Sequence, residues 1–588
     1  MEVTRVFDLI PYQLTQFPQE VMFSMKTDGK WKGISTQEVK DMVDQLSLGF
    51  LALGLKKDDK VAIISNNRIE WNLIDYAVQQ LGVVSVPMYP TITEEDYNYI
   101  LQDAGAKLVF VSNEDLLGKV TRATKDINSI EGIYTFETIA GAKHWTEVKK
   151  LGEDKDVSVL DSHKANVKPD DLLTLIYTSG TTGKPKGVML SHNNLISNFK
   201  ASQPLMPVNN THRALSFLPL CHVYERMLNY LYVYCGLSIY YAESLETISD
   251  NLKEVHPHIF VTVPRLLEKV YDKIHAKGSE LTGVKKAMFF WALNLGLRYE
   301  LSHDLGWWYN FQLKLANKLI FNKWRDALGG QVLAVVSGGA ALQPRLARVF
   351  WAAQIPILEG YGLTETSPTI AVNRCNIYEA RVGTVGPLIS GVEVKIAEDG
   401  EILTRGPHIM KGYYNKPELT AEVIDKDGWF HTGDIGEFVE SKFLKITDRK
   451  KEMFKTSGGK YIAPQSMENK FKESRYIEQI MVLGDGCKYA SALIVPAFDS
   501  VKSWCKIKNI DYTNDEEMLK HPKVVDKFQR EMDEVNESFA QYEKIKRFTL
   551  LTKIWSVDGG ELTAKLSLKR KVIAQKYADS IEKMYQGE

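Results

Sequence analysis

One loop carries the most concentrated chemistry in this chain. Residues 177–187 read YTSGTTGKPKG and follow an apolar run at 172–176. Glycines let a backbone approach an anion with its N–H groups turned toward it, hydroxyls add donors, and ammonium groups neutralise charge. Pro185 follows Lys184, so the Walker order of Lys and then Ser or Thr is absent. We interpret the segment as a polyphosphate-binding loop formed by Thr178, Ser179, Gly180, Thr181, Thr182, Gly183, Lys184 and Lys186.

Further turns carry groups that suit a nucleotide. EGYGLTETSP begins at Glu359, and GWFHTGDIGEF places Asp434 on a tight turn. A glutamate can bind magnesium, and an aspartate can accept hydrogen bonds from ribose hydroxyls. These segments therefore predict a site that binds the phosphates, the metal and the ribose of a nucleotide.

Taken together, the segments resemble the motifs of adenylate-forming enzymes, the superfamily of acyl-CoA synthetases, nonribosomal adenylation domains and beetle luciferases. The resemblance runs from about Phe7 to Tyr585. FLPLCHVYER at Phe217 and ALGGQVLAVVSGGAAL at Ala327 are most similar to long-chain acyl-CoA synthetases. The resemblance implies ligation of a fatty acid to coenzyme A through acyl-AMP, with ATP, Mg²⁺ and coenzyme A as cofactors.

The resemblance also implies residue roles. Glu365 and Thr181 would bind magnesium, Thr364 would contact the α-phosphate, and His222 would line the carboxylate end of the acyl pocket. Lys451 falls at the family's hinge position. Adenine and ribose would be held by Gly338, Gly339, Glu359, Gly360, Tyr361, Asp434 and Arg449, and coenzyme A by Ser457, Gly458, Gly459 and Lys460.

The chain departs from the family near its C-terminus. It reads GELTAKLSLKRK from Gly560, which aligns Ser567 with the family's adenylation lysine. Serine can donate a hydrogen bond but cannot neutralise growing negative charge. Lys565 would share a face with position 567 on an extended strand, and we favour it as the catalytic replacement. Two alternatives stay open: Lys569 acts through a register shift, or adenylation is slow and thioester formation dominates.

Two other functions remain alternatives. The chain could load an acyl group onto a carrier-protein thiol, although no phosphopantetheine-attachment segment follows the C-terminal region, so the carrier would be a separate chain. It could also be a catalytically weakened protein that binds acyl chains or nucleotide, because Ser567 replaces the expected lysine. Chain-length preference is not readable from spacing.

Length and charge limit the class of protein. The 588 residues exceed the ~250 to 300 that one core supports, so two or more domains are expected. A net charge of -1 gives no support for nucleic-acid binding. The five cysteines lack metal-ligand spacing, and the N-terminus lacks a signal-peptide pattern. We expect a cytoplasmic protein that could lie at the inner face of the membrane, and some long-chain relatives are homodimers.

Apolar runs at Val61, Val83 and Leu108 alternate with amphipathic stretches at 67–81 and 94–104, which predicts helices covering a parallel sheet. Thr93 and Gly105 are placed to begin and end the second helix. The expected fold is α/β. A large N-terminal domain, 1–447, has parallel-rich sheets wrapped by helices plus a distorted β-barrel subdomain; a hinge at 448–451 leads to a small mobile α+β lid domain, 452–588.

An aromatic-rich helical region is expected between Lys285 and Gly329. Trp308, Phe311, Leu315 and Leu319 have helical spacing and are interleaved with lysines. Packing into the core is the favoured interpretation of this stripe. A face against an acyl chain or a membrane surface is the alternative.

Overall fold

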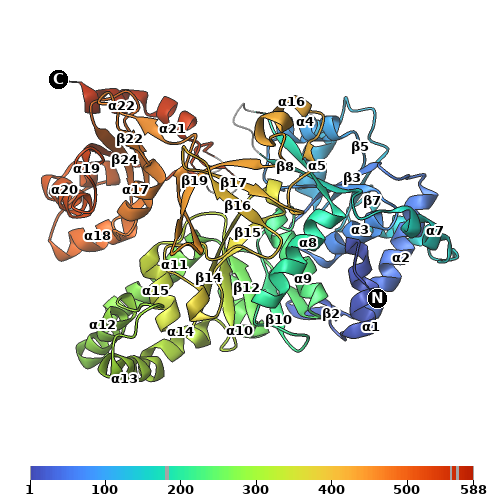
Figure 1. Cartoon of the computed structure of the whole chain (residues 1–588), viewed down its shortest axis with the longest axis horizontal. Coiled ribbons are helices and arrows are strands. Elements are labelled where there is room, and N and C mark those ends of the chain that lie inside the picture. Colours follow the sequence, from blue (N-terminus) through green and yellow to red (C-terminus); the bar gives the residue numbers. More distant parts are fainter. Residues whose placement is uncertain (1, 179–183, 557–558, 564–567, 587–588) are drawn as a thin grey trace. The chain divides into compact units, whose positions relative to one another are not determined.

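The computed structural model describes residues 2–178, 184–556, 559–563 and 568–586. The chain divides into two compact units (Figure 1). The first comprises Met1–Lys395, Leu403–Thr432 and Phe438–Leu444, and the second comprises Ile396–Ile402, Gly433–Glu437 and Lys445–Glu588. The domain limits at 447 and 452 and the hinge between them stay predictions.

The first unit contains two eight-stranded sheets. One has the order β18-β9-β8-β4-β3-β5-β6-β7 and is parallel from β8 to β7. β8 and β9 form an antiparallel hairpin, and β18 pairs antiparallel with β9. The bounds are β3 (Lys60–Ile64), β4 (Val84–Met88), β5 (Ala106–Val111), β6 (Gly132–Thr135), β7 (Lys143–His144), β8 (Leu172–Thr178), β9 (Lys186–Ser191) and β18 (Gly412–Tyr413).

Helices follow these strands as the sequence predicts. α3 (Ile69–Gln79) follows β3, and α4 (Glu94–Ala104) follows β4. The hydroxyl of Thr93 accepts a hydrogen bond from the N–H of Asp96 at the start of α4, and Gly105 ends it with φ +63°. The remaining helices of this region are α1 (Leu9–Gln16), α2 (Thr36–Ala52), α5 (Glu114–Ala123), α6 (Trp145–Lys150) and α7 (Val159–Asn166).

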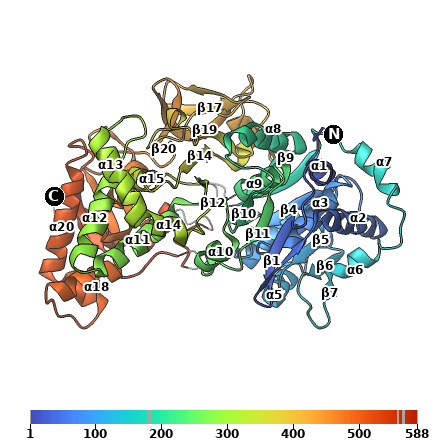
Figure 2. The same ribbon diagram turned by 90° about the horizontal axis from the view of Figure 1, so that it is seen from below.

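The other sheet has the order β15-β14-β13-β12-β10-β11-β1-β2 and is parallel from β14 to β1. α8 (His192–Ser202) and α9 (Val223–Tyr234) lie between the two sheets (Figures 1 and 2), and α9 shares one buried core with strands of both. The bounds are β1 (Phe23–Thr27), β2 (Lys30–Ile34), β10 (Arg213–Ser216), β11 (Ser238–Tyr241), β12 (Ile259–Thr262), β13 (Ala334–Ser337), β14 (Ile357–Gly362) and β15 (Thr369–Val372).

Where the sequence predicts a β-barrel subdomain, the structure has a four-stranded sheet, β16-β17-β19-β20, with β16 and β20 at its edges. Its strands are β16 (Glu393–Ile396), β17 (Glu401–Arg405), β19 (Phe430–Val439) and β20 (Phe443–Arg449). The other helices of the first unit are α10 (Ile248–Val255), α11 (Pro264–Glu280), α12 (Gly283–Leu297), α13 (Trp307–Ala316), the π-helical η3 (Asn317–Phe321), α14 (Asn322–Ala327), α15 (Pro344–Ala352) and α16 (Pro417–Val423).

The second unit is α+β, as expected. Antiparallel β23 (Ile477–Leu483) and β24 (Ala490–Pro496) form a hairpin, and β25 (Ile545–Leu550) adds to β24 in parallel. Buried apolar clusters lie around this sheet. The remaining elements are β21 (Phe454–Lys455), β22 (Tyr461–Ile462), α17 (Pro464–Phe471), α18 (Phe498–Ile507), α19 (Asp515–Lys520), α20 (Pro522–Asn536), α21 (Arg570–Lys576) and α22 (Ala578–Tyr585).

The favoured interpretation of the aromatic stripe is wrong. Trp308, Phe311, Leu315 and Leu319 are exposed, because α13 buries the opposite face of the helix, which carries Tyr309. Helical spacing alone does not say which of two apolar faces is buried. Among the described residues, no helix has the length and apolarity that crossing a bilayer requires.

Candidate functional site

The hairpin β8–β9 flanks the predicted phosphate loop. Thr178, the last residue of β8, pairs across the hairpin with Lys186, the first residue of β9. Both loop lysines rest on aromatic rings: the ammonium of Lys184 lies 5.3 Å from the ring centre of Tyr99, and that of Lys186 lies 4.8 Å from the ring centre of Tyr413. The predicted residues Ser179, Gly180, Thr181, Thr182 and Gly183 lie outside the described residues.

Glu365 contacts Tyr413 from another element. It lies in the short 3-10 helix Thr364–Thr366, directly after β14. The hydroxyl of Tyr413 donates a hydrogen bond of 2.9 Å to its carboxylate. Burial, together with this carboxylate, raises the pKa of Tyr413. Tyr413 therefore contacts a phosphate-loop lysine with its ring and the predicted metal ligand with its hydroxyl.

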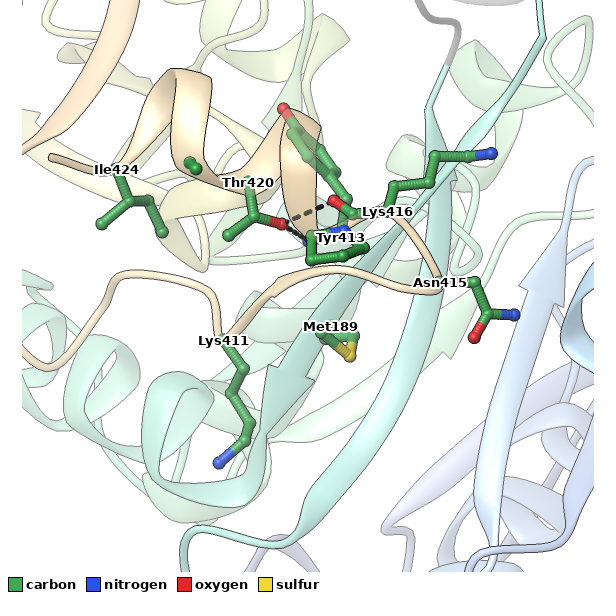
Figure 3. Close-up of a pocket in the computed structure, with 9 residues that line it drawn as sticks. Met189, Lys411, Tyr413, Asn415, Lys416, Thr420 and Ile424 are labelled. Atoms are coloured by element: carbon green, nitrogen blue, oxygen red, sulfur yellow. Dashed lines mark hydrogen bonds between the residues drawn. The ribbon is translucent and has the colours of Figure 1, made fainter.

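Strand pairing fixes the position of Tyr413. It pairs with Val188 of β9, and its N–H donates to the hydroxyl of Thr420 at 2.8 Å. A Cβ at Gly412 would lie 2.8 Å from the Thr420 side chain, so a larger residue would not fit there. Tyr413 also lines a pocket of about 490 Å³ (Figure 3), whose other walls are Met189, Lys411, Asn415, Lys416, Pro417, Thr420, Ala421 and Ile424. Glu365 and Lys186 do not line this pocket.

The single carboxylate of Glu365 suits a magnesium ion that is also bound by a nucleotide. Magnesium is usually bound by one or two carboxylates together with substrate phosphates. Glu365 supplies one carboxylate, and the described residues contain no group of three or more His, Cys, Asp or Glu that could hold a metal by themselves. The arrangement therefore fits an ion that arrives with a nucleotide, held by Glu365. Thr181, the other predicted ligand, lies outside the described residues.

The predicted adenine-binding residues stand at the carboxyl ends of neighbouring parallel strands. Ser337 of β13 pairs with Glu359 of β14, so Gly338 and Gly339 follow beside Gly360 and Tyr361. Gly339 has φ +81°. Burial raises the pKa of Glu359 to about 8, partly offset by a backbone hydrogen bond from Leu342. These residues are brought together as predicted, although their contact with adenine stays a prediction.

His222 begins α9 beside the glycine pair. Its Nδ1 accepts a hydrogen bond of 3.2 Å from the N–H of Tyr224, so the proton of the neutral ring lies on Nε2. The ring of Tyr224 packs against Gly338, where a Cβ would lie 3.1 Å from it. Because α9 and the β13 loop meet here, His222 and Gly338 belong to one region of the first unit.

A buried polar network, which sequence reasoning missed, anchors α9. Arg226 and Asp75 form an ion pair of 2.5 Å with both side chains fully buried. Arg226 also donates to the hydroxyls of Thr174, Ser85 and Tyr230. The available signal was the string ER inside an otherwise uncharged apolar stretch, since charged residues are almost never fully buried unless paired.

Glu225, the neighbour of Arg226, is buried differently. Ser216 and Asn229 donate hydrogen bonds to one of its carboxylate oxygens, and the other has no hydrogen-bond partner among the described residues. Burial raises the pKa of Glu225 to about 8. The carboxyl is therefore mostly protonated at neutral pH, which lets a fully buried acid remain without a cation.

The predicted ribose-binding pair lies in the second unit. Asp434 of β19 is buried, and the guanidinium of Arg449, at the end of β20, lies 3.7 Å from its carboxylate. Gly433, with φ +73°, donates its N–H to the carboxylate of Glu401. The structure thus brings Asp434 and Arg449 together, and ribose binding by them stays a prediction.

The remaining predicted residues also belong to the second unit. Lys451 follows β20 and is exposed. Gly458 and Gly459 form the turn between β21 and β22, closed by a hydrogen bond from the N–H of Thr456 to the carbonyl of Lys460. Ser457 donates its N–H to the carbonyl of Cys487 on the adjacent hairpin. The hinge role of Lys451 and the contact of the turn Ser457–Lys460 with coenzyme A stay predictions.

Of the two candidate lysines near the C-terminus, the structure describes Lys569. Lys565 and Ser567 lie outside the described residues. Lys569 is exposed at the start of α21, and its N–H donates to the carbonyl of Glu561. The choice between Lys565 and Lys569 therefore stays a prediction.

Known proteins resemble the chain over nearly its whole length. The family model of AMP-binding enzymes matches residues 11–414, and that of the AMP-binding enzyme C-terminal domain matches residues 452–588. Long-chain-fatty-acid–CoA ligase FadD15 of Mycobacterium bovis is 32% identical over 97% of this chain and 95% of its own length. Long chain acyl-CoA synthetase 7, peroxisomal, of Arabidopsis thaliana is 31% identical over 95% and 82%, respectively.

Solved structures share the fold. The anthranilate CoA ligase AuaEII in complex with anthranoyl-AMP superposes with a TM-score of 0.74 at 17% identity, covering 98% of each chain. The adenylation domain of a carboxylate reductase from Mycobacterium chelonae gives a TM-score of 0.77 at 20% identity, covering 99% of this chain and 91% of its own. The α/β fold and the resemblance to adenylate-forming enzymes are confirmed. This chain belongs to the family of AMP-binding enzymes.

Proposed function

We propose that this chain ligates a long-chain fatty acid to coenzyme A through an acyl-AMP intermediate. The observation that carries the proposal is the contact of one tyrosine, Tyr413, with the phosphate-loop cation Lys186 and the carboxylate Glu365. Such a pair can neutralise phosphates and hold their magnesium. Relatives named long-chain-fatty-acid–CoA ligases, 30–32% identical over nearly the whole chain, support the choice of acid and acceptor.

The reaction has two displacements at one substrate carboxyl. A carboxylate oxygen bonds to the α-phosphorus of ATP and pyrophosphate leaves; the coenzyme A thiol then bonds to the acyl carbon and AMP leaves. Lys184 and Lys186 bind phosphate, and Nε2–H of His222 is a donor suited to the carboxylate. Magnesium, when held by Glu365, would reduce the charge on the phosphates. The chain's own part is positioning and charge neutralisation.

The other roles rest on the resemblance and are proposals. Thr178 and the glycine-rich loop contact phosphate, Thr364 contacts the α-phosphate, and Tyr361 stacks on adenine. Asp434 and Arg449 bind ribose, and the turn Ser457–Lys460 contacts coenzyme A. A cytoplasmic location, contact with the inner face of a membrane, and a homodimer are also proposals.

A hinge at Lys451 gives a separate prediction. If the C-terminal region turns about this residue between the two steps, Lys451→Pro restricts the turn and affects the steps unequally. Pyrophosphate exchange measures the first half-reaction, and conversion of added acyl-AMP to acyl-CoA measures the second. Lys451→Ala is the control, because it removes the same side chain without fixing φ. Equal losses in both assays for Lys451→Pro would contradict a hinge role.

The function is tested by AMP release with acids from acetate to oleate. We expect release to require fatty acid, ATP and coenzyme A together, and to be fastest with long chains. AMP release with an acyl-carrier protein in place of coenzyme A would favour the carrier alternative. No release with any acid or acceptor, despite nucleotide binding, would support a non-catalytic protein and overturn the proposal.

A further inference from the structure

The outward face of α13 and η3 is apolar. Trp307, Trp308 and Phe311 have 78%, 57% and 54% of their surface exposed, and Leu315 and Leu319 continue the same side. The opposite side is buried in the core through residues such as Tyr309, Ala316 and Phe321. We call the five exposed residues the α13 face.

This pattern is unusual for a surface helix. A helix on a globular protein normally turns charged and polar residues outward, opposite its apolar stripe. Here the three aromatic rings pack on each other instead of on the core: Trp307 and Trp308 have ring centres 5.5 Å apart, and Trp308 and Phe311 stack at 5.7 Å with 17° between their planes. A contiguous exposed patch of this kind marks an interaction surface.

The charges beside the α13 face are mostly positive. Lys314, Lys318 and Lys323 are exposed, and none of them has an ion-pair partner in the part of the chain that the structure describes. Within 304–327 the sequence has four basic residues and two acids: Lys314, Lys318, Lys323 and Arg325 against Asp326 and Asp304, whose carboxylate accepts a hydrogen bond from Asn310 of α13. At 100° per residue along α13, Lys314 projects about 20° from Trp307 and about 60° from Phe311.

We propose that the α13 face binds the surface of an anionic lipid bilayer. Aromatic side chains place apolar rings at the headgroup level, and adjacent lysines extend to acidic headgroups. Each such lysine adds about 1 kcal/mol of attraction near an anionic surface. Because only the outward side of α13 and η3 takes part, the contact is peripheral.

The same charges disfavour a second copy of this chain as the partner. A two-fold contact places each patch against itself, so the lysines of one copy would face the lysines of the other. An anionic bilayer instead complements both the rings and the lysines. If the proposed function holds, this contact brings the enzyme to the phase in which long-chain acids dissolve. The lipid contact itself does not require that function.

Vesicle sedimentation of the full chain tests the proposal. We expect binding to phosphatidylglycerol vesicles, weaker binding to phosphatidylcholine vesicles, and loss of binding with added salt. Trp307→Ser combined with Trp308→Ser and Phe311→Ser should reduce partitioning by more than about tenfold, since the buried apolar area is lost. Lys314→Gln and Lys318→Gln should each reduce binding to anionic vesicles roughly fivefold.

Tyr378→Ser is the matched control, because Tyr378 is an aromatic residue of the first unit that is 75% exposed and belongs to a different element, the 3-10 helix Ile377–Glu379. It should bind vesicles like the unmodified chain. Equal vesicle binding by the triple variant would overturn the proposal. A second result would also overturn it: a dimer in sedimentation velocity that forms with the unmodified chain and with Tyr378→Ser but not with the triple variant. That result would identify the α13 face as a self-association face. AMP release, measured with octanoate in the absence of vesicles, separates this proposal from the proposed function. If the proposed function is wrong, AMP is not released, and vesicle binding does not depend on that result.

Discussion

The buried ion pair under α9 gives a prediction whose size follows from the structure. Arg226→Met would leave the carboxylate of Asp75 fully buried without its cation, and would also remove the donors to Thr174, Ser85 and Tyr230. Removing one partner of a buried pair costs about 3 to 5 kcal/mol. The alternative is to protonate the acid, and an ordinary aspartic acid costs about 4 kcal/mol to protonate at pH 7. The two estimates agree.

Hydrogen exchange of the α9 amides, followed by mass spectrometry, measures this cost locally. When the exchange rate follows the equilibrium population of the open state, a loss of 3 to 5 kcal/mol would speed exchange roughly a hundred- to several-thousand-fold. Adding Asp75→Asn to Arg226→Met removes the unpaired charge and should restore most of the protection. Arg298→Met is the control, since Arg298 is exposed. If the double variant exchanges as fast as Arg226→Met alone, the electrostatic reasoning is wrong.

Three other predictions concern single side chains. Tyr413→Phe keeps the ring under the phosphate-loop lysine but removes the hydrogen bond to Glu365. The magnesium concentration for half-maximal AMP release should therefore change severalfold, with little effect on folding. An unchanged magnesium dependence would contradict a positioning role for Tyr413. The pKa of Glu225, about 8 in the folded chain against 4.5 ordinarily, means that the unfolded chain loses this proton first, so stability falls as pH rises from about 4.5 to 8. Glu225→Gln should remove this part of the pH dependence, and thermal midpoints that stay parallel for the two proteins from about pH 5 to 8 would refute it. Lys565→Ala should abolish most acid-dependent pyrophosphate exchange, whereas unaltered exchange, or a larger loss in Lys569→Ala, would move the catalytic assignment away from Lys565.

Local patterns predicted the parts of the fold that depend on near neighbours. The alternation of apolar runs and amphipathic stretches indicated β3, α3, β4 and α4, because periodicity and capping act within a few residues. The placing of the phosphate loop directly after the apolar run that forms β8 also followed from sequence, since ligands are bound beyond the carboxyl ends of parallel strands.

Long-range partners could not be predicted in the same way. Tyr413 contacts Lys186 and Glu365 through the edge pairing of β18 with β9, and no periodic signal links positions so far apart. The pairing of Arg226 with Asp75 spans 151 positions. Spacing alone predicts the wrong buried side for α13 for a related reason: both faces of this helix are apolar, so the choice between them depends on tertiary packing.

The central claim is that the carboxylate of a fatty acid attacks the α-phosphorus of ATP. The most direct test is to supply a fatty acid whose carboxylate carries a heavy oxygen isotope, with ATP and coenzyme A, and to weigh the products. When acyl-CoA forms through acyl-AMP, one labelled oxygen stays on the phosphate of the released AMP. We predict labelled AMP and unlabelled pyrophosphate. Unlabelled AMP alongside acyl-CoA would contradict the account.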